Sequence, residues 1–146
     1  DVHGSRGLGD VYKRQSIVVE AFVEGRELTV AILGNEIFHP IHIQPAGEFY
    51  DFNSKYAASG TEYAKADLSV QKLQEIKDYA WHAFSSLGCS HWGRVDFIED
   101  KEGNFQIIEV NTIPGLTETS LLPKAASYAG LSFSDIVIKV LLLSCK

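Results

Sequence analysis

The chain has 146 residues, of which 45% are hydrophobic and 22% charged, the balance of one ordinary globular domain. Its formal net charge of -6 argues against nucleic acid as a partner, because phosphate backbones are bound by basic surfaces. No apolar run approaches the roughly 20 residues that a membrane span needs, so we expect a cytoplasmic protein that does not enter a membrane.

Residues 1–15 differ from the rest of the chain because they are rich in glycine and have little apolar periodicity. We interpret them as a non-native leader, and residues 16–146 as the folded domain. The glycines do not indicate a phosphate-binding loop, since no strand is predicted before them and no helix after them.

Three strands are predicted next. Residues 17–23 are apolar and β-branched, Glu24 and Gly25 break the run, and residues 27–33 resume it, which is the pattern of a β-hairpin. A turn at Gly34 and Asn35 leads into a third strand at 37–44. Together these segments predict an antiparallel meander.

A long loop and then a helix follow the meander. Residues 45–67 are rich in turn-forming residues and lack periodicity, and loops of this length in compact domains are often functional. Ser69 is the expected N-cap of an amphipathic helix whose apolar positions repeat at helical spacing through Leu87. Gly88 is expected to end this helix.

A second hairpin is predicted from strands at 92–99 and 105–110, joined by a turn at 100–104. After a loop at 111–120, a short helix is expected with Pro123 in its first turn.

The last predicted helix runs through Leu143 and is opened by Ser132 and Asp135, which form a variant of the capping box. The order of the elements predicts an α+β fold in which helices flank an antiparallel β-sheet.

The second hairpin carries the strongest chemical signal. A two-residue turn at Glu102 and Gly103 would place Asp96 opposite Glu109. Arg94 would then lie opposite Asn111, and all four side chains would share one face because side chains alternate along a strand. A three-residue turn would move Asp96 away from Glu109, so this pairing depends on the register.

Directly opposed carboxylates destabilise a sheet unless a positive charge lies between them. Asp96, Glu109 and the amide oxygen of Asn111 are oxygen ligands of the kind that magnesium prefers, and Glu109 has enough oxygens to bridge two ions. The alternative is a solvated hairpin with surface acids. The spacing alone leaves both interpretations open.

The sequence GRVDF at 93–97 and the sequence EVNTIPGLT at 109–117 resemble the metal- and oxyanion-binding segment of D-alanine-D-alanine ligases, which are ligases of the ATP-grasp superfamily. The likeness covers almost everything after Gln15. It includes PAGEFYD at 45–51, Lys55 with Tyr56, Glu20 with GRE at 25–27, and SLLP at 120–123.

The resemblance implies the C-terminal lobe of an ATP-grasp ligase without its N-terminal domain and small lobe, so this chain alone is expected to be inactive. In that family ATP phosphorylates one D-alanine, and the amine of a second D-alanine attacks the acyl phosphate to give the dipeptide used in peptidoglycan synthesis for the cell wall. The full-length proteins are usually homodimers. The alternatives are a D-alanine-D-lactate ligase, another ATP-grasp carboxylate-amine ligase, or a non-catalytic lobe that binds magnesium and nucleotide.

By this resemblance, Asp96, Glu109 and Asn111 hold two magnesium ions, or manganese in their place, on the phosphates of ATP. Arg94 and the backbone N–H of Gly115 stabilise the oxyanion of the tetrahedral intermediate. Read from the hairpin alone, Arg94 is also a cross-strand partner for the acids, and both roles are compatible.

The resemblance also assigns the substrate contacts. Ser120 and Leu121, at the start of the short helix, receive the substrate carboxylate, while the simpler alternative for Ser120 is an N-cap. Tyr56 lies near the first D-alanine and Lys55 near phosphate, in a loop that closes over the site. The contacts implied for the adenosine of ATP are Glu20, Glu27 and the backbone of Ala21 to Val23.

Overall fold

A computed structural model describes residues 19–44 and 61–145 of the chain. The predicted leader at 1–15, the first two residues of the predicted strand at 17–23, and both Lys55 and Tyr56 lie outside the described residues.

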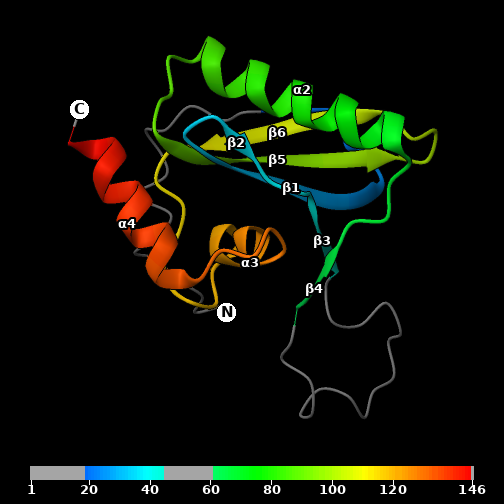
Figure 1. The fold of residues 1–146 in the computed structure, drawn as a ribbon. Helices are drawn as coiled ribbons and strands as arrows, with labels where there is room; N and C mark the ends of the chain where they lie inside the picture. The colour runs from blue at the N-terminus through cyan, green and yellow to red at the C-terminus, as the bar shows by residue number, and fades with distance from the viewer. Residues whose placement is uncertain (1–18, 45–60, 146) are drawn as a thin grey trace, which may run out of the picture.

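The described part is built on an antiparallel six-stranded sheet (Figure 1). The strand order is β4-β3-β1-β5-β6, and β2 pairs with β1 off this path. β1 and β5 form the centre and pair along their whole length, from Gly25 opposite Asp100 to Leu33 opposite Trp92. The strands are β1 (Gly25–Leu33), β2 (Glu36–Ile37), β3 (Ile41–Gln44), β4 (Glu62–Lys65), β5 (Trp92–Asp100) and β6 (Phe105–Asn111).

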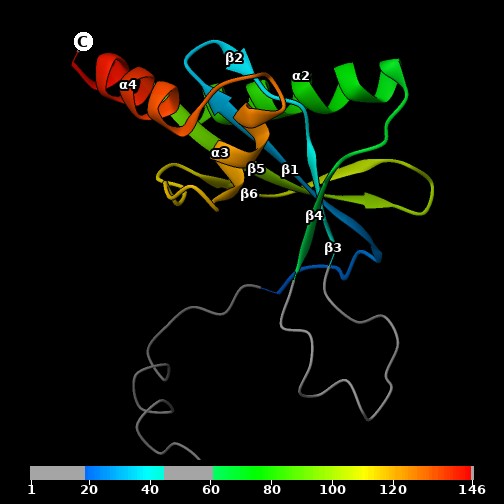
Figure 2. The same cartoon turned by 60° about the horizontal axis from the view of Figure 1, so that its bottom comes forward.

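Helices cover both faces of the sheet, as Figures 1 and 2 show. α2 (Val70–Ser86) lies along one face, and α3 (Leu121–Ser127) and α4 (Phe133–Ser144) lie on the other. This arrangement confirms the predicted α+β class with flanking helices. No helix in 19–44 or 61–145 is long and apolar enough to cross a membrane.

β1 is apolar on both sides because it contributes to two cores. Val30 and Ile32 face α2 and pack in a cluster with Phe84. Ala31 and Leu33 face the other way and pack in a second cluster with residues of α3 and α4. A strand buried on both faces reads as a continuous apolar run rather than an alternating one.

The predicted helix boundaries are confirmed. Ser69 caps α2 by accepting the Lys72 N–H at 3.3 Å, and the capping box of Ser132 and Asp135 opens α4. Pro123 occupies the first turn of α3, where a missing N–H costs no hydrogen bond.

The strand predicted at 17–23 is absent from residues 19–23, the part of it that the structure describes. Residues 19–24 form no strand, and the side chains of Val19 and Phe22 are 88% and 91% exposed. The reason is topological, since β5 occupies one edge of β1 while β2 and β3 occupy the other. A preceding strand would have no free edge of β1 with which to form a hairpin.

The strand predicted at 37–44 is two strands, β2 and β3, interrupted at residues 38–40. Pro40 lacks an N–H and cannot continue the ladder as a donor, although its carbonyl accepts the Ala66 N–H at 2.9 Å. β4 lies within the predicted loop at 45–67 and was not expected. All four of its residues are exposed, so burial imposes no alternating pattern on its sequence.

Candidate functional site

A cluster of polar side chains surrounds Asp96 on the face of the sheet opposite α2. Asp96 is only 6% exposed, and its carboxylate accepts four hydrogen bonds. Oδ1 accepts from Thr29 Oγ1 at 2.5 Å and from Arg94 Nε at 2.8 Å. Oδ2 accepts from Arg94 Nη2 at 2.7 Å and from Asn111 Nδ2 at 2.9 Å. The predicted grouping of Arg94, Asp96 and Asn111 is therefore present.

Glu109 joins this cluster through Asn111. The same Nδ2 atom that donates to Asp96 also donates to Glu109 Oε1 at 2.9 Å. One amide nitrogen thus lies between the two carboxylates, where a hydrogen-bond donor reduces the repulsion between two directly opposed acids.

The pairing of Asp96 with Glu109 was predicted correctly, but from a wrong turn. The loop has three residues, because the Asp100 N–H donates to the Asn104 carbonyl and the Gly103 N–H to the Asp100 carbonyl. Alone, this loop would move Asp96 off Glu109. A β-bulge in β6, at the shift between Asp96 and Phe97 of β5, inserts one extra residue and restores the pairing.

The acidic groups around Arg94 outnumber the positive charge that Arg94 supplies. The pKa of Arg94 is raised, first by its hydrogen bonds to Asp96 and then by the charges of Asp96, Glu109 and Glu27. Three carboxylates therefore act on one guanidinium. Such a group can accept a dication.

The loop after β6 holds Gly115 and Ser120 close together. A Cβ placed on Gly115 would lie 3.0 Å from Ser120 Oγ, so glycine allows this close approach. Ser120 stands at the N-cap position of α3 but makes no side-chain capping bond. Its hydroxyl instead accepts the Thr117 N–H at 3.1 Å and lies 2.8 Å from Thr117 Oγ1. Ser120 is therefore the N-cap residue of α3 by position, but its side chain does not cap the helix.

The residues expected near adenosine lie beside the start of β1. Glu20 and Ala21 are exposed on the segment before the strand, and Val23 is half-buried. Glu27 is exposed on β1 and is near enough to Arg94 to affect its pKa, so it lies beside the acidic cluster. Leu121 is partly buried against the core formed by α3 and α4, so its side chain serves packing.

Thr29 is a site residue that the sequence argument missed. It lies directly opposite Asp96 in the β1–β5 ladder and is 1% exposed. In the run from Leu28 to Leu33 it looks like one more strand-forming residue. Only the register between two strands far apart in the sequence reveals its contact.

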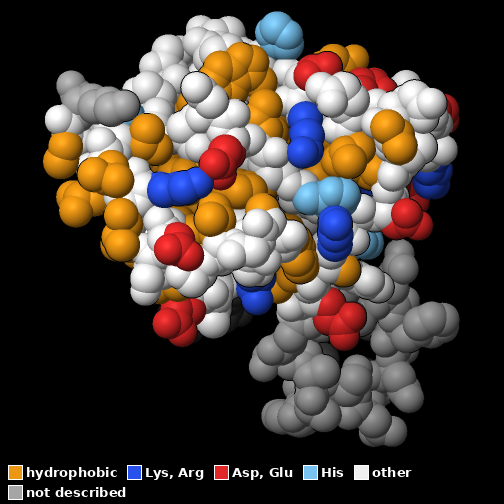
Figure 3. Space-filling model, in the orientation of Figure 1, with side chains coloured by type: hydrophobic (Ala, Val, Ile, Leu, Met, Phe, Trp, Pro, Cys, Tyr) orange, Lys and Arg blue, Asp and Glu red, His pale blue; other side chains and the backbone are white. Residues whose placement is uncertain are grey.

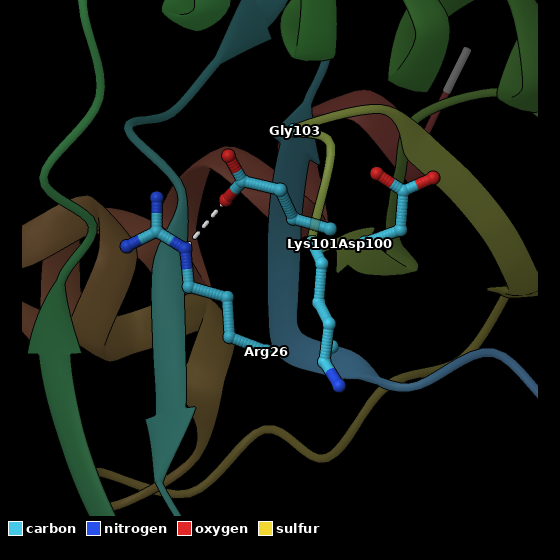
Figure 4. A pocket seen from close by; sticks show the side chains of 6 residues that line it. Arg26, Asp100, Lys101 and Gly103 are labelled. Atoms are coloured by element: carbon cyan, nitrogen blue, oxygen red, sulfur yellow. Dashed lines mark hydrogen bonds and ion pairs between the residues drawn. The ribbon is translucent and has the colours of Figure 1, made fainter.

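The described residues include a pocket that lies elsewhere. It has a volume of about 340 Å³ at the turn between β5 and β6, where Arg26 pairs with Glu99 (Figure 4). None of the predicted site residues line it. Its lining consists of Gly25, Arg26, Glu99, Asp100, Lys101 and Gly103.

The oxygen atoms around Asp96 are of the kind that suits a hard cation, and two carboxylates, those of Asp96 and Glu109, contribute them. Within 19–44 and 61–145, no three His, Cys, Asp or Glu side chains are placed to hold a metal together. The remaining polar side chain between Asp96 and Glu109 is the amide of Asn111, whose Nδ2 atom faces both carboxylates.

Comparison with known proteins agrees with this fold. A family model described as the D-ala D-ala ligase C-terminus matches residues 10–142. A D-alanine-D-alanine ligase from Actinobacillus succinogenes is 43% identical over 129 residues, which are 88% of this chain and 42% of that protein.

Two solved structures are also similar. The D-alanine-D-alanine ligase from Bacillus anthracis complexed with ATP matches with a TM-score of 0.75 and 29% identity, over 86% of this chain and 40% of that one. The VanG D-Ala:D-Ser ligase from Enterococcus faecalis matches with a TM-score of 0.69 and 31% identity, over 84% of this chain and 37% of that one.

These matches place the chain in the ATP-grasp class of ligases. Within that class, the chain belongs to the D-alanine-D-alanine ligase family and carries its C-terminal region. The chain spans about two fifths of the length of the relatives it matches, at 42% and 40% of the first two.

Proposed function

We propose that this chain is the metal-binding and oxyanion-binding part of a ligase that joins two D-alanines through a D-alanyl phosphate, with ATP and magnesium. One observation carries this proposal. Asn111 Nδ2 lies 2.9 Å from an oxygen of Asp96 and 2.9 Å from an oxygen of Glu109. A half-turn of this amide would direct Oδ1 to the same point and complete a set of three oxygen ligands.

Such a set suits magnesium, with manganese able to take its place, and the exposed Glu109 has a second oxygen free to reach a second ion. When bound, the ions neutralise and orient the phosphates of ATP for transfer to the D-alanine carboxylate. The chain's own contribution is to hold the three ligands on one rigid hairpin.

Arg94 supplies the permanent positive charge of the site. Its raised pKa keeps the guanidinium protonated at any working pH. Two of its three nitrogens, Nε and Nη2, donate to Asp96, and they would become available to an oxyanion if a cation took over the charge of Asp96. We propose that Arg94 then stabilises the tetrahedral intermediate together with the Gly115 N–H.

Ser120 is held ready for the substrate carboxylate. Thr117 fixes its hydroxyl by a backbone and a side-chain contact, at 3.1 and 2.8 Å. A hydroxyl positioned in advance loses little conformational entropy on binding. Its closeness to Gly115 puts the carboxylate contact beside the proposed oxyanion donor. We propose that Leu121 contributes its backbone N–H.

Further residues of this chain are proposed to contact the substrates, and other parts of the longer protein to complete the site. We propose that Lys55 and Tyr56 contact phosphate and the first D-alanine, and that Glu20, Glu27 and the backbone from Ala21 to Val23 contact adenosine. The 146-residue chain alone is expected to release no phosphate from ATP and D-alanine. The whole ligase is proposed to act in the cytoplasm as a homodimer, supplying dipeptide for cell-wall precursors.

The names of the similar proteins differ in the second amino acid that is joined to D-alanine. One similar structure is a D-Ala:D-Ser ligase, at 31% identity. D-serine and D-lactate are therefore the competing second substrates to offer beside D-alanine.

The test is ATP- and D-alanine-dependent phosphate release by the full-length ligase that contains this sequence. Asp96→Asn and Glu109→Gln are expected to slow phosphate release by more than about tenfold. Removing a residue that only hydrogen-bonds to a metal ligand already costs about tenfold in activity, so changing the ligand itself should cost more. Glu102→Gln is the matched control, because Glu102 is an exposed acid in the turn of the same hairpin. Unchanged rates in both site variants would refute the metal assignment.

A further inference from the structure

We infer that Thr29 is the positioning residue that orients Asp96 for metal binding, an inference that rests on the proposed function. Thr29 lies on β1, directly opposite Asp96 on β5. Its side chain is buried, and its hydroxyl donates to Asp96 Oδ1. It is also the one polar residue in the apolar run from Leu28 to Leu33.

The carboxylate of Asp96 has a limited capacity for hydrogen-bond donors and metal ions. Two oxygens offer about four lone-pair positions, and four hydrogen bonds already reach them. A cation can bind Asp96 only if a donor leaves. The question is which donors leave and which one remains.

Three of the four bonds come from groups with another task. Arg94 provides two, and its guanidinium is needed for the oxyanion. Asn111 provides one, and its amide must turn so that oxygen rather than nitrogen faces the ion. Thr29 provides the fourth and has no competing task. It is therefore the donor that can stay on Asp96 when metal binds.

The position of Thr29 makes it a rigid anchor. Both edges of β1 are paired at this residue, with Ile41 of β3 on one side and Asp96 on the other. A β-branched side chain in a buried strand has few rotamers. With Oδ1 fixed by Thr29, Oδ2 is the oxygen directed toward Asn111 and, through it, toward Glu109. Thr29 thus selects which oxygen of Asp96 meets the ion.

The experiment measures Mn²⁺ binding to the 146-residue chain, with free Mn²⁺ counted by its paramagnetic resonance signal. Thr29→Val keeps the shape of the side chain and removes the donor, so we expect affinity to fall at least roughly tenfold. Thr29→Ser keeps the donor and should recover most of the affinity. Thr61→Val is the control, an equivalent change at an exposed residue before β4.

Melting temperatures in a chelator show whether each variant is folded. If Thr29→Val does not fold, the pair Thr29→Ser and Thr29→Ala carries the test, because these variants differ by one hydroxyl. A drop in melting temperature with unchanged Mn²⁺ affinity would show a purely structural threonine and overturn the inference. Equal weakening by serine and valine would overturn it as well, because the hydroxyl would not be the cause.

Glu109→Gln separates this inference from the proposed metal site. If Glu109→Gln loses Mn²⁺ while Thr29→Val binds like the wild type, the metal site stands and the role of Thr29 fails. If the wild type binds no Mn²⁺, or Glu109→Gln binds as well as the wild type, both the metal assignment and the inference fail.

Discussion

At the scale of single residues, the site is a buried acid that three neighbouring residues hold by hydrogen bonds. Asp96 is held by Arg94, Asn111 and Thr29, and each contact also keeps the carboxylate from being buried without partners. Removing one member of a buried ion pair leaves an uncompensated charge. The residues proposed for catalysis therefore also stabilise the fold while no cation is bound.

Arg94→Gln is expected to destabilise the chain by about 1–3 kcal/mol, less than for a fully buried pair because the Arg94 side chain is 18% exposed. Added magnesium should recover more stability in this variant than in the wild type, since the ion replaces the missing charge. Urea unfolding with and without magnesium measures both effects. If magnesium raised the free energy of unfolding equally in the two proteins, the idea that the ion replaces the charge of Arg94 would be wrong.

His39 gives the chain an acid-sensitive stability. Burial lowers its pKa from 6.5, and the charges of Lys65 and Lys77 lower it further, against a hydrogen bond to the Ala66 carbonyl. The unfolded chain therefore takes up a proton at a higher pH than the folded chain. Above about pH 6.5, His39 is neutral in both states and does not lower the free energy of unfolding. As the pH falls from there toward the lower pKa of the folded state, His39 lowers the free energy of unfolding progressively.

His39→Gln should accordingly flatten the fall in melting temperature below pH 6.5, while the curves above that pH stay parallel. Melting curves at a series of pH values test this. His82→Gln, at an exposed histidine of α2, is the control and should keep the wild-type slope. A parallel curve for His39→Gln across the whole range would show that His39 is not the titrating group.

At the scale of elements, the β5–β6 hairpin shows how much of the site was predictable. Period-two alternation and the helix caps are local signals, so β5, β6 and all three described helices were placed within a residue or two. The bulge in β6 and the pairing of Thr29 with Asp96 are not local. Their registers depend on packing between segments that the sequence does not show to be neighbours.

The same limit explains the errors. The apolar residues at 19–23 match a strand pattern, but both edges of β1 are occupied by other strands. β4 is a strand because it pairs with β3. All four of its residues are exposed, so its sequence does not show the alternation of apolar and polar residues that predicts a strand. Composition and spacing predict local conformation, whereas competition for sheet edges is a property of the whole fold.

Gly103 sets the geometry of the hairpin turn. Its φ of +81° lies in the left-handed region, as the three-residue hairpin loop requires. Gly103→Ala should destabilise the chain by roughly 1–2 kcal/mol. Gly103→Asn should cost less, because asparagine tolerates this conformation. Chemical denaturation measures both, and equal stability of all three proteins would show that the turn does not constrain the hairpin.

At the scale of the whole molecule, α4 presents an exposed apolar surface. Ile138, Leu141 and Leu142 are 55%, 60% and 62% exposed. Their neighbour Val137 is 38% exposed. Figure 3 shows hydrophobic side chains gathered over α4. Contiguous apolar patches on a surface usually mark a contact or an aggregation risk.

The isolated chain is therefore expected to bind the hydrophobic dye ANS through α4. Changing Leu141 and Leu142 together to lysine should remove most of the dye fluorescence without lowering the melting temperature, since both side chains already lie largely in solvent. Val70→Lys is the control, because Val70 is 81% exposed at the start of α2. Undiminished fluorescence in the double variant would place the dye site elsewhere.

The most direct test of the metal assignment is a crystal structure of the chain grown with Mn²⁺, with the ion located by its anomalous scattering. We expect a peak within coordination distance of Asp96 Oδ2, a Glu109 oxygen and Asn111 Oδ1. Arg94 should then have left Oδ2. Manganese bound away from this face, or bound there with the Arg94–Asp96 pair intact and the Asn111 amide unturned, would contradict the account.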